Sequence, residues 1–154
     1  MCILILNGPN LNRLGTRRTD IYGTQTMAQI LLDIQRAYPD VHFVYRQSNH
    51  EGDLIDWIQE GNTDRCADRI QNTDLIGIVL NAGGYTHTSV ALRDAVEDCP
   101  VPVVEVHISD ISQREPFRCV SLLTDVCAHS IIGHGTDGYR EAVEWIVEGL
   151  GIRG

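Results

Sequence analysis

Two hydrophobic patterns alternate along the chain. Short runs dominated by apolar residues are typical of strands that a parallel sheet buries on both faces, and they predict strands at 2–6, 41–46, 75–84, 101–109 and 128–133. Longer segments carry apolar residues at intervals of three or four positions, the spacing of one helical face. They predict helices at 26–38, 51–61, 89–99 and 138–151.

Residues at the ends of the predicted elements agree with this assignment. Thr26 is placed to cap the first helix, Pro39 follows its end, and Gly61 stops the second helix. The polar segment 62–74 is either a continued helix or a loop, and residues 111–119 are predicted to be a loop with two arginines. The element boundaries are therefore predicted everywhere except around 62–74.

Strands and helices alternate from one end of the sequence to the other. This order predicts an α/β fold, a doubly wound parallel sheet with helices on both faces and right-handed crossovers. A chain of 154 residues is long enough to bury a substantial core, and it contains no linker, repeat or low-complexity segment. We expect one catalytic domain spanning residues 1–154.

Composition and charge narrow the classes of partner. The formal net charge of −9 argues against binding nucleic acid or an anionic membrane, although a small site can still be locally basic. No apolar run approaches the ~18 residues of a membrane span, and we identify no signal peptide. The five cysteines are odd in number and form no C-x-x-C pair, so we expect reduced, mostly buried thiols in the cytoplasm.

Polar clusters follow four of the predicted strands. They read "NGPN", "QSNHEG", "NAGGYTHTS" and "HISDISQREPFR". Ligands of such sheets bind beyond the carboxyl ends of the strands, so these four segments are expected to meet at one edge. The candidate residues there are Asn10, Arg17, Tyr22, Asn81, His87, Glu105, His107, Ser109, Arg114 and Arg118.

The candidate residues favour acid–base chemistry on a polar, anionic small molecule. The sequence has no metal-ligand spacing and no phosphate-binding loop of the G-x-x-x-x-G-K type, so we expect neither a metal nor a cofactor. "GHGTDG" (133–138) matches a dinucleotide fingerprint, but only 16 residues follow it. The later strand that would carry an acidic ribose ligand therefore cannot exist.

Two pairs of residues are the strongest candidates for acid and base. Glu105 and His107 are two apart on a predicted strand and therefore point to the same side. A carboxylate beside an imidazole orients the ring and favours its protonated form, which suits a general acid. Tyr22 lies in a loop with Arg17, and a nearby guanidinium favours a phenolate, which suits a base. The spacing alone leaves open that both pairs are ordinary polar residues.

Seven stretches, taken together, carry a resemblance to a known family. They are "LNGPNLNRLG", "YG", "RQSNHEGDLIDWI", "LNAGGYTHTSVALRDA", "VEVHIS", "REPFR" and "GHGTDGY", between residue 4 and about residue 146. In order and spacing they resemble type II 3-dehydroquinate dehydratase. The resemblance implies a flavodoxin-like fold with a five-stranded parallel sheet. It also implies dehydration of 3-dehydroquinate to 3-dehydroshikimate without metal or organic cofactor, in the shikimate pathway or in quinate catabolism.

The resemblance also assigns catalytic roles to residues of this chain. Tyr22 would take the C2 proton, with Arg17 holding it as phenolate, and Asn10 would position a water against the enolate oxygen. His107, held by Glu105, would protonate the departing C1 hydroxyl.

Further residues would bind the substrate. Asn81 and the backbone at Ile108 and Ser109 would hold the carboxylate, and His87 and Arg118 the ring hydroxyls. Arg114 would belong to the mobile loop region. Asp94 would be lent to a neighbouring subunit in a dodecamer, a tetramer of trimers.

One part of the chain departs from the family pattern. The usual R-E-P of the active-site loop is replaced by "RRTD" (17–20), which leaves open whether Arg18 assists Tyr22 or only loosens the loop.

Two alternative interpretations assign the chain to other functional classes. A receiver module needs clustered acids after the first strand, where this chain has Asn7 and Asn10, and a flavin-binding module would copurify yellow. An inactive assembly or regulatory protein would have no need to retain Tyr22, His107 and Arg118.

Overall fold

A parallel sheet forms the centre of the computed structural model, which describes residues 1–60 and 75–151. Within those residues the strands are β1 (Cys2–Asn7), β2 (His42–Gln47), β3 (Leu75–Asn81), β4 (Val103–His107) and β5 (His129–Ile132). All neighbouring strands pair in parallel, in the order β2-β1-β3-β4-β5. The predicted doubly wound α/β fold is confirmed, and the open question about 62–74 lies outside the described residues.

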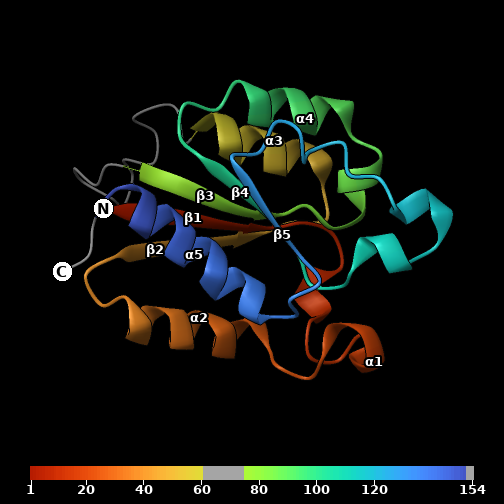
Figure 1. Ribbon diagram of the computed structural model, residues 1–154, viewed down its shortest axis with the longest axis horizontal. Helices are drawn as coiled ribbons and strands as arrows, with labels where there is room; N and C mark the ends of the chain where they lie inside the picture. The colour runs from red at the N-terminus through yellow and green to blue at the C-terminus, as the bar shows by residue number, and fades with distance from the viewer. Residues whose placement is uncertain (61–74, 152–154) are drawn as a thin grey trace.

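Helices cover both faces of this sheet (Figure 1). Helices α2 (Met27–Ala37) and α5 (Asp137–Gly149) lie on one face, and α3 (Glu51–Glu60) and α4 (Val90–Glu97) lie on the other. The apolar stripes predicted from the sequence point inward and bury Ile30 and Ile34 on the first face and Leu54 and Ile58 on the second. Strands that are buried on both faces explain why the first strand is an uninterrupted apolar run.

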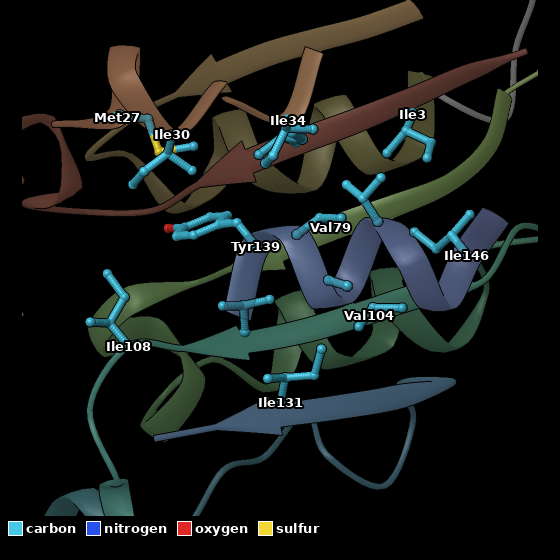
Figure 2. Packing of buried hydrophobic residues seen from close by; sticks show 14 of the residues in the cluster. Ile3, Met27, Ile30, Ile34, Val79, Val104, Ile108, Ile131, Tyr139 and Ile146 are labelled. Carbon is cyan, nitrogen blue, oxygen red and sulfur yellow. The ribbon is translucent and has the colours of Figure 1, made fainter. Parts of the chain in front are cut away.

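Two hydrophobic clusters therefore exist, one on each side of the sheet. Figure 2 shows the first, in which Ile3, Val79 and Val104 of the strands face Tyr139 and Ile146 of α5. Side chains from every second position of a strand reach the same face, which is the reason that β1 contributes to both clusters.

Local capping fixes where α2 and α4 begin. Thr26 accepts a hydrogen bond from the backbone N–H of Gln29, and the Gln29 side chain accepts from the backbone N–H of Thr26, at 3.3 and 2.9 Å. This reciprocal capping box confirms the predicted helix start. Ser89 caps α4 in a similar way, accepting from the backbone N–H of Leu92 at 2.9 Å.

The segments expected to be loops contain short helical turns. A 3₁₀ turn, η1 (Leu11–Arg13), and one turn of α-helix, α1 (Thr19–Tyr22), lie between β1 and α2. The segment 111–119 contains the turns η4 (Ile111–Gln113) and η5 (Pro116–Arg118). Such turns satisfy local backbone groups without a hydrophobic stripe, so periodicity does not reveal them.

Cysteine burial differs from the expectation. No disulfide joins the described cysteines, but only Cys2 among them is buried, and Cys119 in the loop after β4 is exposed. Among the described residues, no helix is long and apolar enough to cross a membrane.

Candidate active site

The loops at the carboxyl ends of β1, β3 and β4 enclose a pocket of about 140 Å³. It lies where a doubly wound sheet places its ligands. The lining includes ten of the predicted site residues, namely Asn10, Arg17, Tyr22, Asn81, His87, His107, Ile108, Ser109, Arg114 and Arg118. The structure therefore brings three of the four predicted clusters into the pocket lining, whereas no residue of "QSNHEG" after β2 belongs to it.

Two predicted site residues do not line the pocket. Glu105 is fully buried behind His107, and Asp94 is an exposed residue of α4. Within residues 1–60 and 75–151, no group of three or more histidine, cysteine or acidic side chains is placed to hold a metal ion.

A glycine, Gly8, allows the loop after β1 to approach the end of β3 closely. The backbone N–H of Gly8 donates to the carbonyl oxygen of Asn81 at 2.7 Å, and a Cβ on Gly8 would overlap the carbonyl of Ala82. Asn10, with φ of 68°, occupies the left-handed region that asparagine tolerates better than most residues. Its backbone N–H donates to the Asn49 side chain at 2.9 Å. The loop after β2 thereby fixes the loop that carries Asn10.

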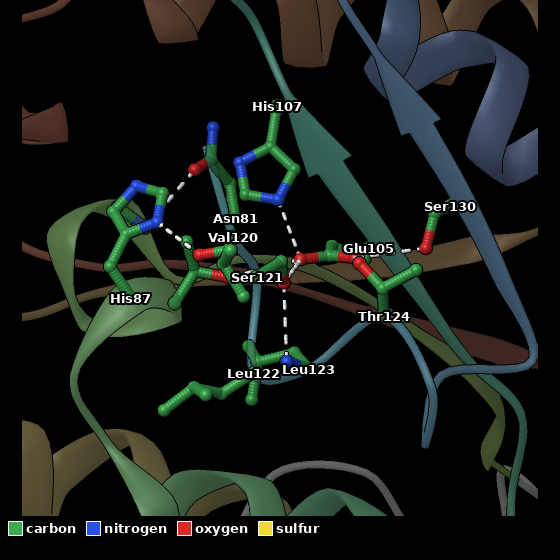
Figure 3. A network of polar contacts seen from close by, with 12 residues as sticks. Asn81, His87, Glu105, His107, Val120, Ser121, Leu122, Leu123, Thr124 and Ser130 are labelled. Atoms are coloured by element: carbon green, nitrogen blue, oxygen red, sulfur yellow. Dashed lines mark hydrogen bonds and ion pairs between the residues drawn. The ribbon is translucent and has the colours of Figure 1, made fainter. Parts of the chain in front are cut away.

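Glu105 and His107 form the pair that their spacing predicted. The carboxylate oxygen Oε1 of Glu105 lies 2.5 Å from Nε2 of His107 (Figure 3), and the two side chains are 0% and 6% exposed. Hydroxyl groups surround the rest of the carboxylate, and these come from Thr86, Ser121, Thr124 and Ser130. The carboxylate is therefore held in place from several sides.

This environment decides the charge of Glu105. Burial alone would raise the pKa of the carboxyl group, but the hydrogen bond and positive charge of His107, together with the hydroxyls of Ser121 and Thr124, lower it to about 2. Glu105 is consequently an anion at neutral pH, and it holds the imidazole ring of His107 by its Nε2 atom. The other ring nitrogen, Nδ1, is then available on the pocket side of the ring, where His107 lines the cavity.

Two guanidinium groups contact Tyr22. The Arg17 guanidinium lies over the ring, 4.9 Å from its centroid, and Nη1 of Arg114 donates to the hydroxyl oxygen at 3.3 Å. The hydrogen bond to Tyr22 raises the pKa of Arg114, whose Nη1 also donates to the Ser109 hydroxyl at 3.2 Å. Arg114 thus contacts the predicted base itself, a position that the resemblance did not assign to it.

Arg18 pairs with Asp20 instead of contacting Tyr22. Its Nη2 atom lies 3.1 Å from Oδ2 of Asp20, and both side chains are more than 60% exposed. With φ of 38°, Arg18 precedes α1 in the left-handed region. The cations in contact with Tyr22 are Arg17 and Arg114, and Arg18 acts on Tyr22 only as a more distant charge.

His87 and Arg118 also line the pocket. Nδ1 of His87 donates to the carbonyl oxygen of Val120 at 2.7 Å, since a carbonyl can only accept, and this leaves Nε2 unprotonated in the neutral ring. Nε of Arg118 is buried and lies 3.2 Å from Oε2 of Glu115 without making a hydrogen bond. His87 therefore keeps one ring nitrogen that the Val120 carbonyl does not engage.

Sequence reasoning missed several residues that support the site. The hydroxyl groups around Glu105 include Ser121, Thr124 and Ser130, which lie in segments without any catalytic pattern. Tyr139, which donates to Asn7 and accepts from Asn81, appeared in "GHGTDGY" and in a predicted helix without any role at the site. Thr86 lies within "NAGGYTHTS", so its place in a polar strand-end cluster was the one available signal.

Comparison with known proteins identifies the family. The model of the family described as Dehydroquinase class II matches residues 1–147. A 3-dehydroquinate dehydratase from Azorhizobium caulinodans is 50% identical over 89% of this chain and 87% of its own length. One from Rhodopseudomonas palustris strain BisA53 is 46% identical over 97% of this chain and 95% of its own length.

A solved structure agrees with both sequence matches. The crystal structure of the type II dehydroquinase from Butyrivibrio crossotus superimposes with a TM-score of 0.85 and 39% identity, covering 95% of this chain and 97% of that chain. The match of sequence and fold places this chain in the class II dehydroquinase family.

Proposed function

We propose that the pocket dehydrates 3-dehydroquinate to 3-dehydroshikimate, with Tyr22 as base and His107 as acid. The observation that carries the proposal is that a candidate base, Tyr22, and a candidate acid, His107, line the same cavity. Tyr22 lies between two guanidinium groups, and His107 lies on a buried carboxylate. The relatives named 3-dehydroquinate dehydratase support the substrate.

The first step removes the proton from C2 of the substrate. The guanidinium groups of Arg17 and Arg114 favour the phenolate form of Tyr22, because a nearby positive charge stabilises an anion. The phenolate oxygen takes the proton, and the electrons of the C–H bond pass to the neighbouring carbonyl group to give an enolate. Asn10, at the rim of the pocket, positions a water molecule against the enolate oxygen.

The second step expels the hydroxyl group from C1. The enolate electrons return to form the C1–C2 double bond, the C1–O bond breaks, and His107 supplies a proton so that water leaves. Glu105 keeps the imidazole oriented for this transfer and compensates its positive charge. Tyr22 afterwards returns the proton taken from C2 to solvent, and His107 regains one.

Binding groups are distributed on both sides of these reacting groups. The proposal assigns the substrate carboxylate to the Asn81 side chain and to the backbone at Ile108 and Ser109. It assigns the ring hydroxyls to His87 and Arg118, which both line the cavity, and His87 keeps a ring nitrogen that the Val120 carbonyl does not engage.

The proposal also covers the oligomeric state of the protein and its cellular compartment. We propose a dodecamer in which Asp94 reaches a neighbouring site. Support comes from Val90, four positions before Asp94 on α4, whose apolar side chain is 60% exposed. An exposed apolar side chain on the same helical face is a candidate contact with another copy. We further propose that residues 1–154 act as one catalytic domain and that the protein works in the cytoplasm, in keeping with the lack of a disulfide among the cysteines of residues 1–60 and 75–151.

An absorbance assay tests the reaction directly. The product contains a carbonyl group conjugated with the new double bond, so turnover of 3-dehydroquinate produces an ultraviolet absorption that the substrate lacks. We expect the purified protein to generate this absorption without added metal. A preparation that binds 3-dehydroquinate but produces no absorption would refute the proposed reaction.

A further inference from the structure

A buried tyrosine that the proposed mechanism does not use lies directly beneath the pocket. Tyr139, in the first turn of α5, is 0% exposed. Its hydroxyl group donates to Oδ1 of Asn7 at 2.8 Å and accepts from Nδ2 of Asn81 at 3.0 Å. Figure 2 shows the ring inside the hydrophobic cluster, with the hydroxyl pointing toward the end of the sheet where Ile108 lies.

The direction of each hydrogen bond in this network is determined by a backbone group. The N–H of Gly83 can only donate, and it lies 3.2 Å from Oδ1 of Asn81. The Asn81 oxygen is thereby assigned to the Gly83 side, which turns Nδ2 toward Tyr139. Because the Tyr139 oxygen accepts that bond, its own proton goes to Asn7.

This arrangement leaves one donor on Asn81 for a ligand. An amide nitrogen carries two hydrogens, and one of those on Asn81 goes to Tyr139. The second has no hydrogen-bond partner within residues 1–60 and 75–151, and Asn81 lines the pocket beside His87 and His107 (Figure 3). An N–H donor suits a carboxylate oxygen, whereas the amide oxygen would repel it.

We propose that Tyr139 is a positioning residue, which holds the Asn81 amide so that it presents an N–H group to the substrate carboxylate. The inference rests on the proposed function and adds to it a residue outside the pocket. Asn81 is held at two points, Gly83 and Tyr139. Loss of the tyrosine hydroxyl leaves only the first, and the amide can then rotate away from its binding orientation.

The test is a kinetic comparison of Tyr139→Phe with the wild-type protein. We expect KM for 3-dehydroquinate to rise about tenfold, the factor for about 1.4 kcal/mol, with kcat changed by less than about twofold. The inhibition constant of the product, which keeps the carboxylate, should rise in the same proportion. Unchanged KM and product inhibition in a folded variant would overturn the inference.

Tyr45→Phe is the matched control. The Tyr45 hydroxyl accepts from Nδ2 of Asn7 at 3.4 Å, so it belongs to the same buried network but does not touch Asn81. A purely structural role predicts that both variants lower the unfolding temperature and leave KM alone. A positioning role predicts that only Tyr139→Phe raises KM.

A second readout separates this inference from the proposed function. In the wild-type protein the side-chain amide protons of Asn81 should exchange slowly with solvent in an NMR experiment, and Tyr139→Phe should accelerate that exchange while Tyr45→Phe does not. Equal exchange in both variants overturns the positioning role even if the enzyme is active. A wild-type protein without turnover refutes the proposed function, and the exchange data still decide what Tyr139 holds.

A double variant covers the case in which Tyr139→Phe does not fold. That substitution leaves Oδ1 of Asn7 buried without its donor. Asn7→Leu combined with Tyr139→Phe removes both partners, and Asn7→Leu alone is its reference. The same rise in KM between reference and double variant supports the inference, and equal KM values overturn it.

Discussion

Nη1 of Arg114 lies 3.3 Å from the hydroxyl oxygen of Tyr22, although 92 residues separate the two in the chain. With Arg17 stacked 4.9 Å from the ring centroid, the phenol is flanked by two cations. In a chain of net charge −9, this concentration of arginine is a local feature of the pocket. It gives the candidate base the environment that an anionic oxygen requires.

Replacing Tyr22 tests this base directly. Tyr22→Phe removes the oxygen that accepts the proton, and we expect kcat to fall about 10³-fold, within the range for general base catalysis. Binding of 3-dehydroshikimate, measured by calorimetry, should change little because the ring remains. Tyr45→Phe, outside the pocket, is the control and should keep its kcat. Normal turnover by Tyr22→Phe would refute the tyrosinate mechanism.

Substitutions of Arg114 and Arg18 should have very different effects on kcat. Arg114→Gln removes the guanidinium that donates to the Tyr22 hydroxyl, and we expect kcat to fall about 10- to 100-fold, because the anionic oxygen loses its hydrogen-bond donor. Arg18→Gln alters an exposed side chain that pairs with Asp20, and it should change kcat much less. The measurement is kcat of both variants at the same pH. An equal loss in both would show that the contact with Tyr22 has no effect.

His107→Ala should separate the two proton transfers. Tyr22 still removes the C2 proton in this variant, but no group protonates the departing hydroxyl. We therefore expect exchange of the C2 proton with deuterated solvent to continue while formation of the enone falls by about 10²- to 10⁴-fold, the usual contribution of a general acid. NMR follows the first process and absorbance the second. If both processes are lost to the same extent, His107 is not specifically the acid.

Glu105 should make the stability of the protein depend on pH in the acid range. Its pKa is lowered from 4.5 to about 2, so the folded state binds fewer protons than the unfolded state between these values. The resulting stabilisation, about 3 kcal/mol, is complete above the unfolded pKa and is lost as the pH falls toward 2.

Urea unfolding at pH 7 and at pH 3 measures this effect. We expect Glu105→Gln to lose less free energy of unfolding between the two pH values than the wild-type protein does. Asp20→Asn is a suitable comparison, because that carboxylate is 66% exposed and its pair with Arg18 is screened by solvent. Identical pH dependence of wild type and Glu105→Gln would mean that the buried carboxylate is not ionised.

The exposed side chain of Val90, about one helical turn before Asp94, leads to a prediction about assembly. Val90 begins α4 and is 60% exposed, so a charge there would face a partner's apolar surface if copies meet at this position. We expect Val90→Glu to shift the protein to smaller particles in sedimentation, with a parallel loss of activity, whereas Val90→Leu retains the larger form. An unchanged particle size in Val90→Glu would place the interface elsewhere.

Much of the fold could be predicted from the spacing of apolar residues along the sequence. A strand buried on both faces must be apolar throughout, as in 2–6, and a helix on a sheet must carry an apolar stripe, as in 26–38. The alternation of these elements predicts the parallel sheet, and the parallel sheet predicts that the polar clusters meet at one edge. Glu105 and His107 could be paired from their spacing because a strand has a fixed period of two.

Tertiary packing decided which of the gathered side chains touch. The contact of Arg114 with Tyr22, the hydroxyl groups around Glu105, and the link from Tyr139 to Asn81 all join segments that no local period relates. Each depends on how a loop or helix is placed over the sheet, and that placement results from burial of the whole hydrophobic core. Local sequence specifies which face of an element is buried, whereas only the assembled core brings polar groups from separate elements within hydrogen-bond distance.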